Sequence, residues 1–295
     1  MQEQVIDIHN FRNWYKSELR RVSDSGISDN NKKLILDFNR YLVLENRSLA
    51  RRIKVLSCLK LIAVKLGKDF DKATKEDLIQ YIESLETSGY KEWTKHTIKS
   101  ILKKFYKWLK GNNQYYPEEI SWLKAAKSKG IKLPEELLTK EEVVKLLNSC
   151  RSIRNKAFII TLFESGCRIA ELGNLRIKHV VFDQYGTVII VSGKTGMRRV
   201  RLIDSTPYLA NWIENHPFRD NREKPLWATI KGTEATYAAL SKLLRETAER
   251  SGVKKKVNPH IFRHSRSTIN ANFMTEAQMN NYFGWVQGSG MASTY

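Results

Sequence analysis

The sequence predicts a mainly α protein of two parts: a helical bundle, then a mixed, mostly helical domain with a small antiparallel β-sheet or hairpin. Two observations predict this fold class. Apolar residues recur at helical spacing throughout residues 31–124, and strand-like runs gather between residues 187 and 203. A polar connector with Gly130 and Pro134 separates the two patterns. With 295 residues, the chain is long enough to form two cores.

Three helices are expected in the first part. The first follows Ser48, whose hydroxyl can cap it, and ends at Gly67, where a left-handed residue suits a helix C-terminus. The second opens at Thr74 with a weak capping box, and the third covers residues 94–110. The first helix places a set of apolar residues on one face: Leu49, Ile53, Leu56, Leu59 and Ala63. Such faces indicate a bundle of about four helices.

The second part begins with a clear capping box at Thr139–Glu142. Strands are expected at 187–192 and 198–203, joined by a short loop with glycines at both ends. Further helices are expected near residues 207–215, 234–251, 260–271 and 275–283. We therefore predict four segments: an N-terminal extension (1–28), a helical domain (29–126), a linker (127–138) and a second domain (139–295).

Bulk composition narrows the class of partner. The formal net charge of +20 and the pI near 9.8 favour a polyanion, either nucleic acid or an acidic membrane surface. No run of 18 apolar residues is present, so we expect no membrane insertion. The first ten residues lack a signal-peptide layout, which predicts an intracellular, cytoplasmic protein. Cys58, Cys150 and Cys167 are scattered, so we expect reduced thiols and neither a disulfide framework nor a metal site.

A stripe of lysines follows one face of the helix expected at 94–110. Like charges at four-residue steps weaken an isolated helix, so the stripe is either a tolerated solvated face or a surface for phosphates. Since no acidic partners that would offset it are evident and the chain is strongly basic, we favour contacts with phosphates. The stripe consists of Lys95, Lys99, Lys103 and Lys107, and Arg51 and Arg52 are weaker candidates of the same kind.

The second part carries residues suited to phosphoryl transfer. Such a reaction needs an in-line nucleophile, fixed cations for the non-bridging oxygens and an acid for the leaving oxygen. Arg168 lies between a helix expected to end at Gly166 and another that begins directly after it, where backbone donors also favour an anion. An ion pair with Glu171 is an equally good interpretation of Arg168. Tyr295 is the last residue of the sequence.

Two further candidates are weak when taken singly. His260 and Arg263 are three residues apart on an expected helix and so reach one patch, yet an ordinary surface pair explains that spacing as well. Lys194 lies at the tip of the expected hairpin, where most lysines are simply solvated.

In combination, these residues resemble the tyrosine recombinase (phage integrase) family. An arginine in G-x-R-x-x-E-L, a hairpin lysine, H-x-x-R-H, a Gly-Trp pair and a tyrosine follow one another in the family's order. The resemblance covers most of residues 137–295. The helical domain is similar, less specifically, to the family's core-binding (SAM-like) DNA-binding domain. The segment 284–295 looks most like archaeal, archaeal-virus or Xer-like members.

The resemblance implies a role for each of these residues. Arg168 and Arg263 would hold the scissile phosphate, Lys194 would protonate the 5′-oxygen, and His260 would assist proton transfer. Tyr295 would attack and form a 3′-phosphotyrosyl link. The remaining implied residues support these: Trp285 by contact and packing, because its indole cannot shuttle a proton, and Glu171 and His264 as supports of the site. The chemistry implies no metal, nucleotide or other cofactor.

The implied function is site-specific recombination of double-stranded DNA, in integration or excision of a mobile element or in Xer-like resolution. A tetramer is expected on DNA and a monomer or dimer without it. Two alternatives stay open: a nicking and religating enzyme like the type IB topoisomerases, and a catalytically silent DNA-binding protein of the same fold. Relatives usually continue beyond the tyrosine, so we expect Tyr295 to be weakly held.

Overall fold

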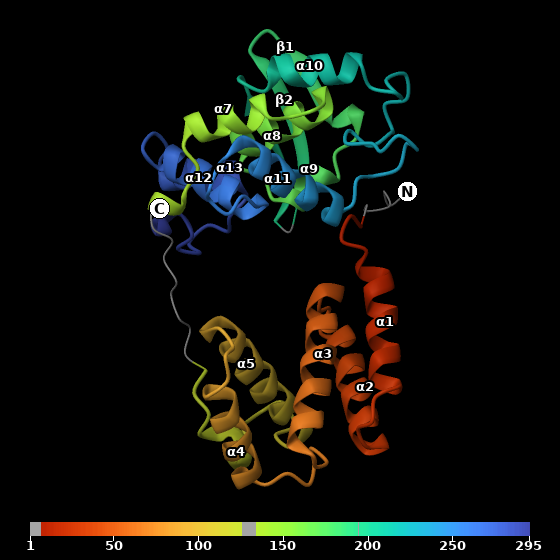
Figure 1. The fold of residues 1–295 in the computed structure, drawn as a ribbon. Helices are drawn as coiled ribbons and strands as arrows, with labels where there is room; N and C mark the ends of the chain where they lie inside the picture. The colour runs from red at the N-terminus through yellow and green to blue at the C-terminus, as the bar shows by residue number, and fades with distance from the viewer. Residues whose placement is uncertain (1–6, 126–133, 194) are drawn as a thin grey trace. The chain divides into compact units, whose positions relative to one another are not determined.

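The computed structural model describes residues 7–125, 134–193 and 195–295 (Figure 1). The chain divides into two compact units. The helical unit comprises Asn10–Ile131, and the second unit comprises Met1–His9 together with Lys132–Tyr295. The mainly α fold class with a small antiparallel sheet is confirmed.

The helical unit packs its helices around one apolar core, to which Phe38, Leu59 and Phe105 contribute. As expected, Ser48 caps α3, Gly67 ends it with φ 65°, and Thr74 forms a capping box at the start of α4. The helices described here are α1 (Phe11–Ser23), α2 (Asp29–Leu44), α3 (Leu49–Leu66), α4 (Lys75–Glu86), α5 (Glu92–Leu109) and α6 (Glu118–Ser121).

Helix α1 lies within the segment expected to be an N-terminal extension. It packs along α3, and Val22 at its end is fully buried in the core of the helical unit. The sequence signal was weak because α1 carries few apolar residues among many polar ones, and its N-cap, Asn10, makes no side-chain cap hydrogen bond. The first helix is therefore an integral part of the bundle.

The second unit surrounds helix α8, which is buried from Ala157 to Ser165. The helices described in this unit are α7 (Lys140–Asn148), α8 (Ile153–Ser165), α9 (Ile169–Gly173), α10 (Thr206–Glu214), α11 (Tyr237–Ser251), α12 (Pro259–Ala271) and α13 (Glu276–Phe283), with short 3₁₀ turns at Pro134–Glu136, Ile177–His179 and Ala292–Thr294. The expected capping box at Thr139 starts α7. Figure 1 shows α12 and α13 beside one another at the blue end of the chain, where they are in contact.

The sheet has the order β1-β2-β3 and is antiparallel throughout. Strands β2 (Gly186–Gly193) and β3 (Gly196–Leu202) are the two expected strands, and Val191 pairs with Arg198 across them. Strand β1 (Val180–Asp183) was not expected, because it has four residues and only Val180 is buried. The hairpin of β2 and β3 therefore ends at Gly193 and Gly196, next to residue 194.

The segment that precedes α1 packs on the second unit. Ile8 is buried, and its carbonyl accepts a hydrogen bond of 2.9 Å from the Tyr237 N–H at the start of α11. A Cβ at Gly173 would lie 2.8 Å from Ile8 Cδ1, so a glycine at the end of α9 makes room for this side chain. The helical unit is thus an insertion between two stretches of the second unit.

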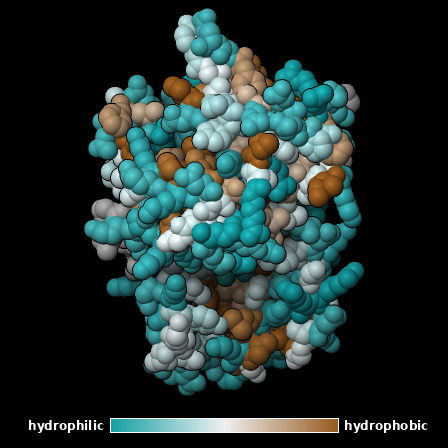
Figure 2. Space-filling view, turned by 45° about the horizontal axis from the view of Figure 1, so that its top comes forward, coloured by the Kyte–Doolittle hydropathy of each residue, from teal (hydrophilic) through white to brown (hydrophobic). Residues whose placement is uncertain are grey.

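Figure 2 shows a surface on which hydrophilic residues predominate and hydrophobic ones lie in small groups. Isolated exposed apolar side chains of this kind are usual for a folded protein. Within the part of the chain that the structure describes, no helix has the length and apolar character needed to cross a membrane.

Candidate active site

Arg168 is positioned by the junction between two helices. Gly166 ends α8 with φ 54°, and a Cβ there would lie 2.5 Å from a ring carbon of Phe283, so this position needs glycine. Arg168 then stands at the N-cap of α9. Its N–H donates to Glu171 Oε2 (3.0 Å) and its Nη1 to Glu171 Oε1 (2.7 Å). The expected ion pair is present, and the arginine side chain still keeps 36% of its surface exposed.

Arg263 enters the same place from α12 and is buried. Its Nη1 donates to the Gly166 carbonyl (2.9 Å) and its Nη2 to the Phe283 carbonyl (2.7 Å). The guanidinium also lies over the Trp285 ring, 5.4 Å from its centroid. Burial, and then repulsion by Arg168, lower the pKa of Arg263 to about 10. A cation disfavoured in this way is stabilised by an incoming anion.

A third arginine, Arg198, was missed at the sequence level. It lies on β3, where Nη2 donates to Glu171 Oε2 (2.7 Å) and Nε donates to the Tyr282 carbonyl (2.9 Å). Its signal was the two-residue period of the strand, because Arg198 shares a face with the buried Val200 and Leu202. An arginine on the buried face of a strand points to a partner inside the protein.

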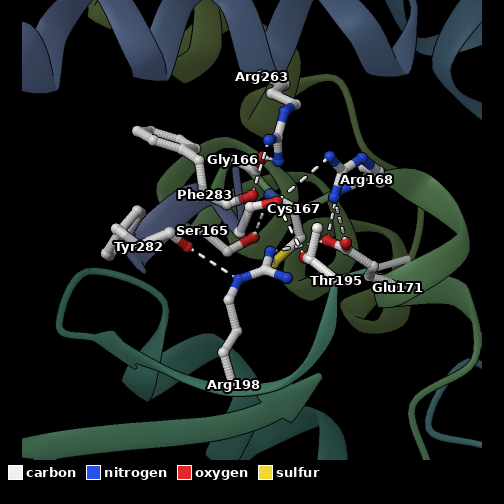
Figure 3. A network of polar contacts seen from close by, with 11 residues as sticks. Ser165, Gly166, Cys167, Arg168, Glu171, Thr195, Arg198, Arg263, Tyr282 and Phe283 are labelled. Atoms are coloured by element: carbon white, nitrogen blue, oxygen red, sulfur yellow. Dashed lines mark hydrogen bonds and ion pairs between the residues drawn. The ribbon is translucent and has the colours of Figure 1, made fainter. Parts of the chain in front are cut away.

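Glu171 joins two of these arginines, as Figure 3 shows. Its carboxylate accepts from Arg168 and Arg198 and is 3% exposed. Burial alone would raise the pKa of Glu171, but hydrogen bonds from Arg198 and Arg168 hold it below its usual range. With three guanidinium groups and one carboxylate in this network, positive charge is in excess. Among the described residues, no group of three or more His, Cys, Asp or Glu side chains could hold a metal ion.

The C-terminal end of α13 supplies the remaining acceptors. The carbonyls of Tyr282, Phe283 and Gly284 lie where a helix leaves its last acceptors unpaired. Arg198 donates to the first and Arg263 to the second. The third accepts from Thr195 Oγ1 (3.0 Å) and faces Arg168 Nη2 at 3.5 Å. This end of the helix is also the negative end of its dipole, so it stabilises the arginine cluster without a second carboxylate.

Tyr295 is held beside this cluster. Its ring stacks on Trp285 with a centroid distance of 5.5 Å and an interplanar angle of 4°, and Trp285 in turn stacks on Phe283. Its hydroxyl is hydrogen-bonded to His264 Nδ1 (2.5 Å). Burial raises the pKa of Tyr295, against the opposing effects of Ser267 and Arg263. These contacts differ from the weak anchoring expected for this residue, because the stacked rings fix it from within the domain.

His260 and Lys194 are placed less fully. His260 lies exposed in the first turn of α12, one turn before Arg263, and its N–H donates to Asn258 Oδ1 (3.0 Å). Lys194 falls outside the described residues. Both of its neighbours reach the site, however. A Cβ at Gly193 would collide with the Glu171 carboxylate, and Thr195 bonds to Gly284.

The phage integrase family model matches residues 136–295. The chain belongs to the phage integrase family. Among its relatives are the tyrosine recombinase XerA of Pyrococcus horikoshii, 26% identical over 255 residues (81% of this chain and 79% of that protein), and the tyrosine recombinase XerD of Bifidobacterium longum, 24% identical over 216 residues (67% of this chain and 69% of that protein). The predicted enzyme class, a tyrosine-type site-specific DNA recombinase, is confirmed, and neither the topoisomerase nor the silent binding protein is favoured.

Solved structures agree on the fold of this integrase-family chain. The XerH site-specific recombinase bound to a palindromic difH substrate has a TM-score of 0.69 at 21% identity and covers 100% of this chain and 94% of that one. A lambda integrase dimer bound to a COC′ core site has a TM-score of 0.70 at 16% identity and covers 89% of this chain and 76% of that one. At these identities the likeness establishes the fold alone.

In the integrase-family chain two lysines of the stripe on α5 are paired with carboxylates. Lys95 donates to the Glu86 carbonyl (2.7 Å) and lies 3.0 Å from Glu92, with only 10% of its side chain exposed. Lys99 forms an ion pair with Glu86. The premise that acidic partners are absent was therefore wrong. These carboxylates come from outside the periodic lysine pattern, and Glu86 belongs to α4.

The other basic candidates also have intramolecular contacts. Lys103 donates to the Leu123 carbonyl (2.6 Å), and both Lys103 and Lys107 lie over the Tyr116 ring, at 4.5 Å and 5.3 Å. Arg52 donates to Asn39 Oδ1 (3.1 Å) and stacks over Tyr15. Arg51 is half-buried in the first turn of α3, where its backbone N–H is capped by Ser48.

Proposed function

We propose that the protein cleaves and rejoins double-stranded DNA at a specific site by forming a covalent link between Tyr295 and a 3′-phosphate. One observation carries this proposal. Arg168 and Arg263, which come from separate helices, converge at the end of α13, and the rings that follow this helix lead directly to Tyr295. Two fixed guanidinium groups beside a tyrosine are what transfer of a phosphoryl group to that tyrosine requires.

In this mechanism Arg168 and Arg263 bind the non-bridging oxygens of the scissile phosphate. A phosphate oxygen carries negative charge, so a guanidinium binds it more strongly than it binds the neutral Gly284 and Phe283 carbonyls. Glu171 keeps Arg168 oriented while its exposed edge receives the phosphate. Trp285 positions the tyrosine by stacking and takes no part in proton transfer.

The covalent step is a balanced exchange of two P–O bonds. The Tyr295 oxygen attacks phosphorus, the bond to the 5′-oxygen breaks, and Lys194 gives that oxygen a proton. The proton of the tyrosine passes to an imidazole: His264, already hydrogen-bonded to the hydroxyl, or His260, one turn earlier on α12. Because the new phosphodiester retains the bond energy, a 5′-hydroxyl can reverse the step without a cofactor.

The partner is duplex DNA, and the net charge of +20 supports its attraction. Among the basic residues on α5, Lys107 is the best remaining candidate for a phosphate contact, because its ammonium lies over the Tyr116 ring and not against a carboxylate. A tetramer on DNA, with a monomer or dimer in its absence, is part of the proposal. It is supported by the fold shared with the lambda integrase tetramer bound to a Holliday junction. We place the reaction in the cytoplasm.

The decisive experiment uses a nicked duplex, selected from a random-sequence pool by binding, in which cleavage traps the covalent product. The wild-type protein should form an adduct that protects the DNA 3′-phosphate, and Tyr295→Phe should form none. Tyr185→Phe is the matched control, because Tyr185 is an exposed tyrosine of the same unit. An adduct that survives in Tyr295→Phe would contradict the assignment of the nucleophile.

Two further outcomes separate the alternatives. If the wild-type protein binds the selected duplex tightly but never forms an adduct, the protein is a DNA-binding module. If it relaxes supercoiled plasmids that lack the selected site, it acts like a topoisomerase. Exchange of strands between two copies of the selected site is the result expected for a recombinase.

A further inference from the structure

Arg198 is a buried arginine of the site, and it is less accessible to solvent than Arg168. Its side chain is 11% exposed, whereas that of Arg168 is 36% exposed. Both of its strong hydrogen bonds go to groups that other parts of the site depend on, namely the Glu171 carboxylate and the Tyr282 carbonyl. A third, weaker contact reaches Cys167 Sγ at 3.6 Å. These contacts suit a residue that acts through its neighbours.

The first connection runs through Glu171 to Arg168. Glu171 Oε1 accepts from Arg168 Nη1, and Oε2 is shared by the Arg168 N–H and Arg198 Nη2. A carboxylate held on both oxygens has one orientation. The two other bonds both come from Arg168 itself, so Arg198 supplies the bond that ties this pair to β3. Arg198 therefore fixes the plane in which the Arg168 guanidinium lies.

The second connection runs through α13 to Tyr295. Arg198 Nε donates to the carbonyl of Tyr282, and the next carbonyl, that of Phe283, accepts from Arg263. A Cβ at Gly284 would lie 2.8 Å from Arg198 Nη1, so the backbone passes close to this guanidinium. The chain then continues into Trp285 and its stacking partner Tyr295. The Arg198 side chain thus contacts Glu171, which supports Arg168, and the end of α13, from which the segment with Tyr295 begins.

Stability alone gives a poor account of Arg198. Its buried Nη1 finds no hydrogen-bond partner among the described residues, and an unpaired buried donor is costly. A buried guanidinium that shares its carboxylate with a second arginine often gives no more stability than an apolar side chain of similar size. The position is therefore better explained by geometry than by a gain in folding free energy.

We propose that Arg198 is a positioning residue for DNA cleavage, which orients Arg168 through Glu171 and sets the end of α13 from which the Trp285–Tyr295 segment begins. This inference rests on the proposed function, because its readout is the cleavage step. Arg198 touches neither the phosphate nor the DNA in the reaction. Its loss should slow the chemical step and leave the affinity for DNA unchanged.

The test compares Arg198→Met with Arg201→Met under single-turnover conditions on the nicked duplex. Arg201 is the matched control, since it lies on the same strand, is 41% exposed and pairs with Asp183 at the surface. Arg198→Met should slow cleavage about 100-fold, the size expected for a small misplacement of reacting groups, while the Kd for DNA changes less than about threefold. Arg201→Met should cleave at the wild-type rate.

Two additional variants separate positioning from simple loss of structure. Arg198→Lys should recover part of the rate, because an ammonium can still reach one of the two acceptors. The double variant Arg198→Met/Glu171→Gln should cleave no more slowly than the slower of the two single variants, because both act along one path. If Arg198→Met does not fold, the cleavage rate and the Kd for DNA of Arg198→Lys decide between positioning and loss of structure. A slower cleavage rate at an unchanged Kd supports positioning.

The inference is overturned if Arg198→Met cleaves at the wild-type rate, or if DNA binding falls in parallel with cleavage. It is also overturned if the Arg198 and Glu171 effects simply add. These results differ from failure of the proposed function, in which the wild-type protein itself forms no adduct and Tyr295→Phe changes nothing.

Discussion

The lysines of α5 and the arginines around Glu171 are two clusters of positive charge that the structure neutralises in different ways. On α5, Lys95 and Lys99 meet Glu86 and Lys104 meets Glu45, and Lys110, directly after the helix, meets Glu119. Around Glu171, one carboxylate serves two arginines, while Arg263 bonds to backbone carbonyls. The second cluster keeps an excess of charge and a set of donors that a phosphate can recruit.

The difference teaches that the spacing of charges along a helix is a poor guide to an anion site. A stripe at four-residue steps can be satisfied by acids from a neighbouring helix, which the stripe itself does not reveal. Convergence of donors from distant segments is a better guide, because it places charges close together at a cost in repulsion. Burial is the main cause of the lowered pKa of Arg263, and repulsion by Arg168, the second cause, is one sign of that cost.

The largest effect should come from removing an arginine from the cluster around Glu171. Arg263→Ala is expected to lower the rate of cleavage about 1000-fold, since its charge stabilises the transition state. Binding to the selected duplex should change little, because many other contacts hold the DNA. Single-turnover cleavage and a binding titration at one salt concentration measure the two quantities. A fall in both by the same factor would show that Arg263 serves binding and not chemistry.

The same substitution in each cluster should affect stability unequally. Glu171→Gln removes a buried carboxylate from between two arginines and should lower the free energy of unfolding by about 3 kcal/mol. Glu86→Gln removes a more exposed carboxylate and should cost less than about 1 kcal/mol. Urea unfolding measures both values. Equal costs would mean that the two clusters do not differ in the way described.

Salt dependence should distinguish lysines within α5. Lys107→Ala is expected to reduce the slope of log K against log salt by about 1, the value for one lost phosphate contact. Lys95→Ala should leave the slope unchanged, because Lys95 is turned toward Glu86 and Glu92. The affinity for the selected duplex across a salt series tests this pair. A reduced slope for Lys95→Ala would show that Lys95 also contacts DNA, and would support the whole stripe as a DNA-binding surface.

The smallest effect concerns acid stability of the helical unit. Burial alone would raise the pKa of Glu45, but hydrogen bonds from Lys104, Tyr41 and Arg47 hold it at about 2. The ionised carboxylate therefore stabilises the folded state fully above its ordinary pKa of 4.5, and this contribution is lost as the pH falls toward 2. Glu45→Gln should remove the contribution, worth less than about 1 kcal/mol for a partly exposed group. The difference in the free energy of unfolding between the two proteins, measured with urea, should be smaller at pH 3 than at pH 5.

Local signals predicted much of the fold and the junction that carries Arg168. Capping residues such as Ser48 and Thr139, and the glycine at position 166, act on their own helix ends and can therefore be recognised from neighbouring residues. Arg168 was predicted from such a junction. Its pairing with Glu171 was one of two interpretations, and the structure contains both the pair and an exposed edge.

What could not be predicted depends on contacts between distant segments. Arg198 meets Glu171 only after β3 packs on α8 and α13 and its neighbour β2 packs on α9. The carboxylates opposite Lys99 and Lys104 come from α4 and from the residue that follows α2. The stacking of Tyr295 on Trp285 needs the turn after α13 to bring two rings together. None of these pairings produces a periodic pattern in the sequence.

The burial of Ile8 has a consequence for where the second unit can be divided. A protein that began at residue 132 would contain α9 and α11 but lack the side chain that fills the space at Gly173 and Leu240. That gap lies at the end of the short helix whose N-cap is Arg168. An independent catalytic fragment therefore needs two pieces of chain, with residues up to His9 joined to the portion from Lys132 onward.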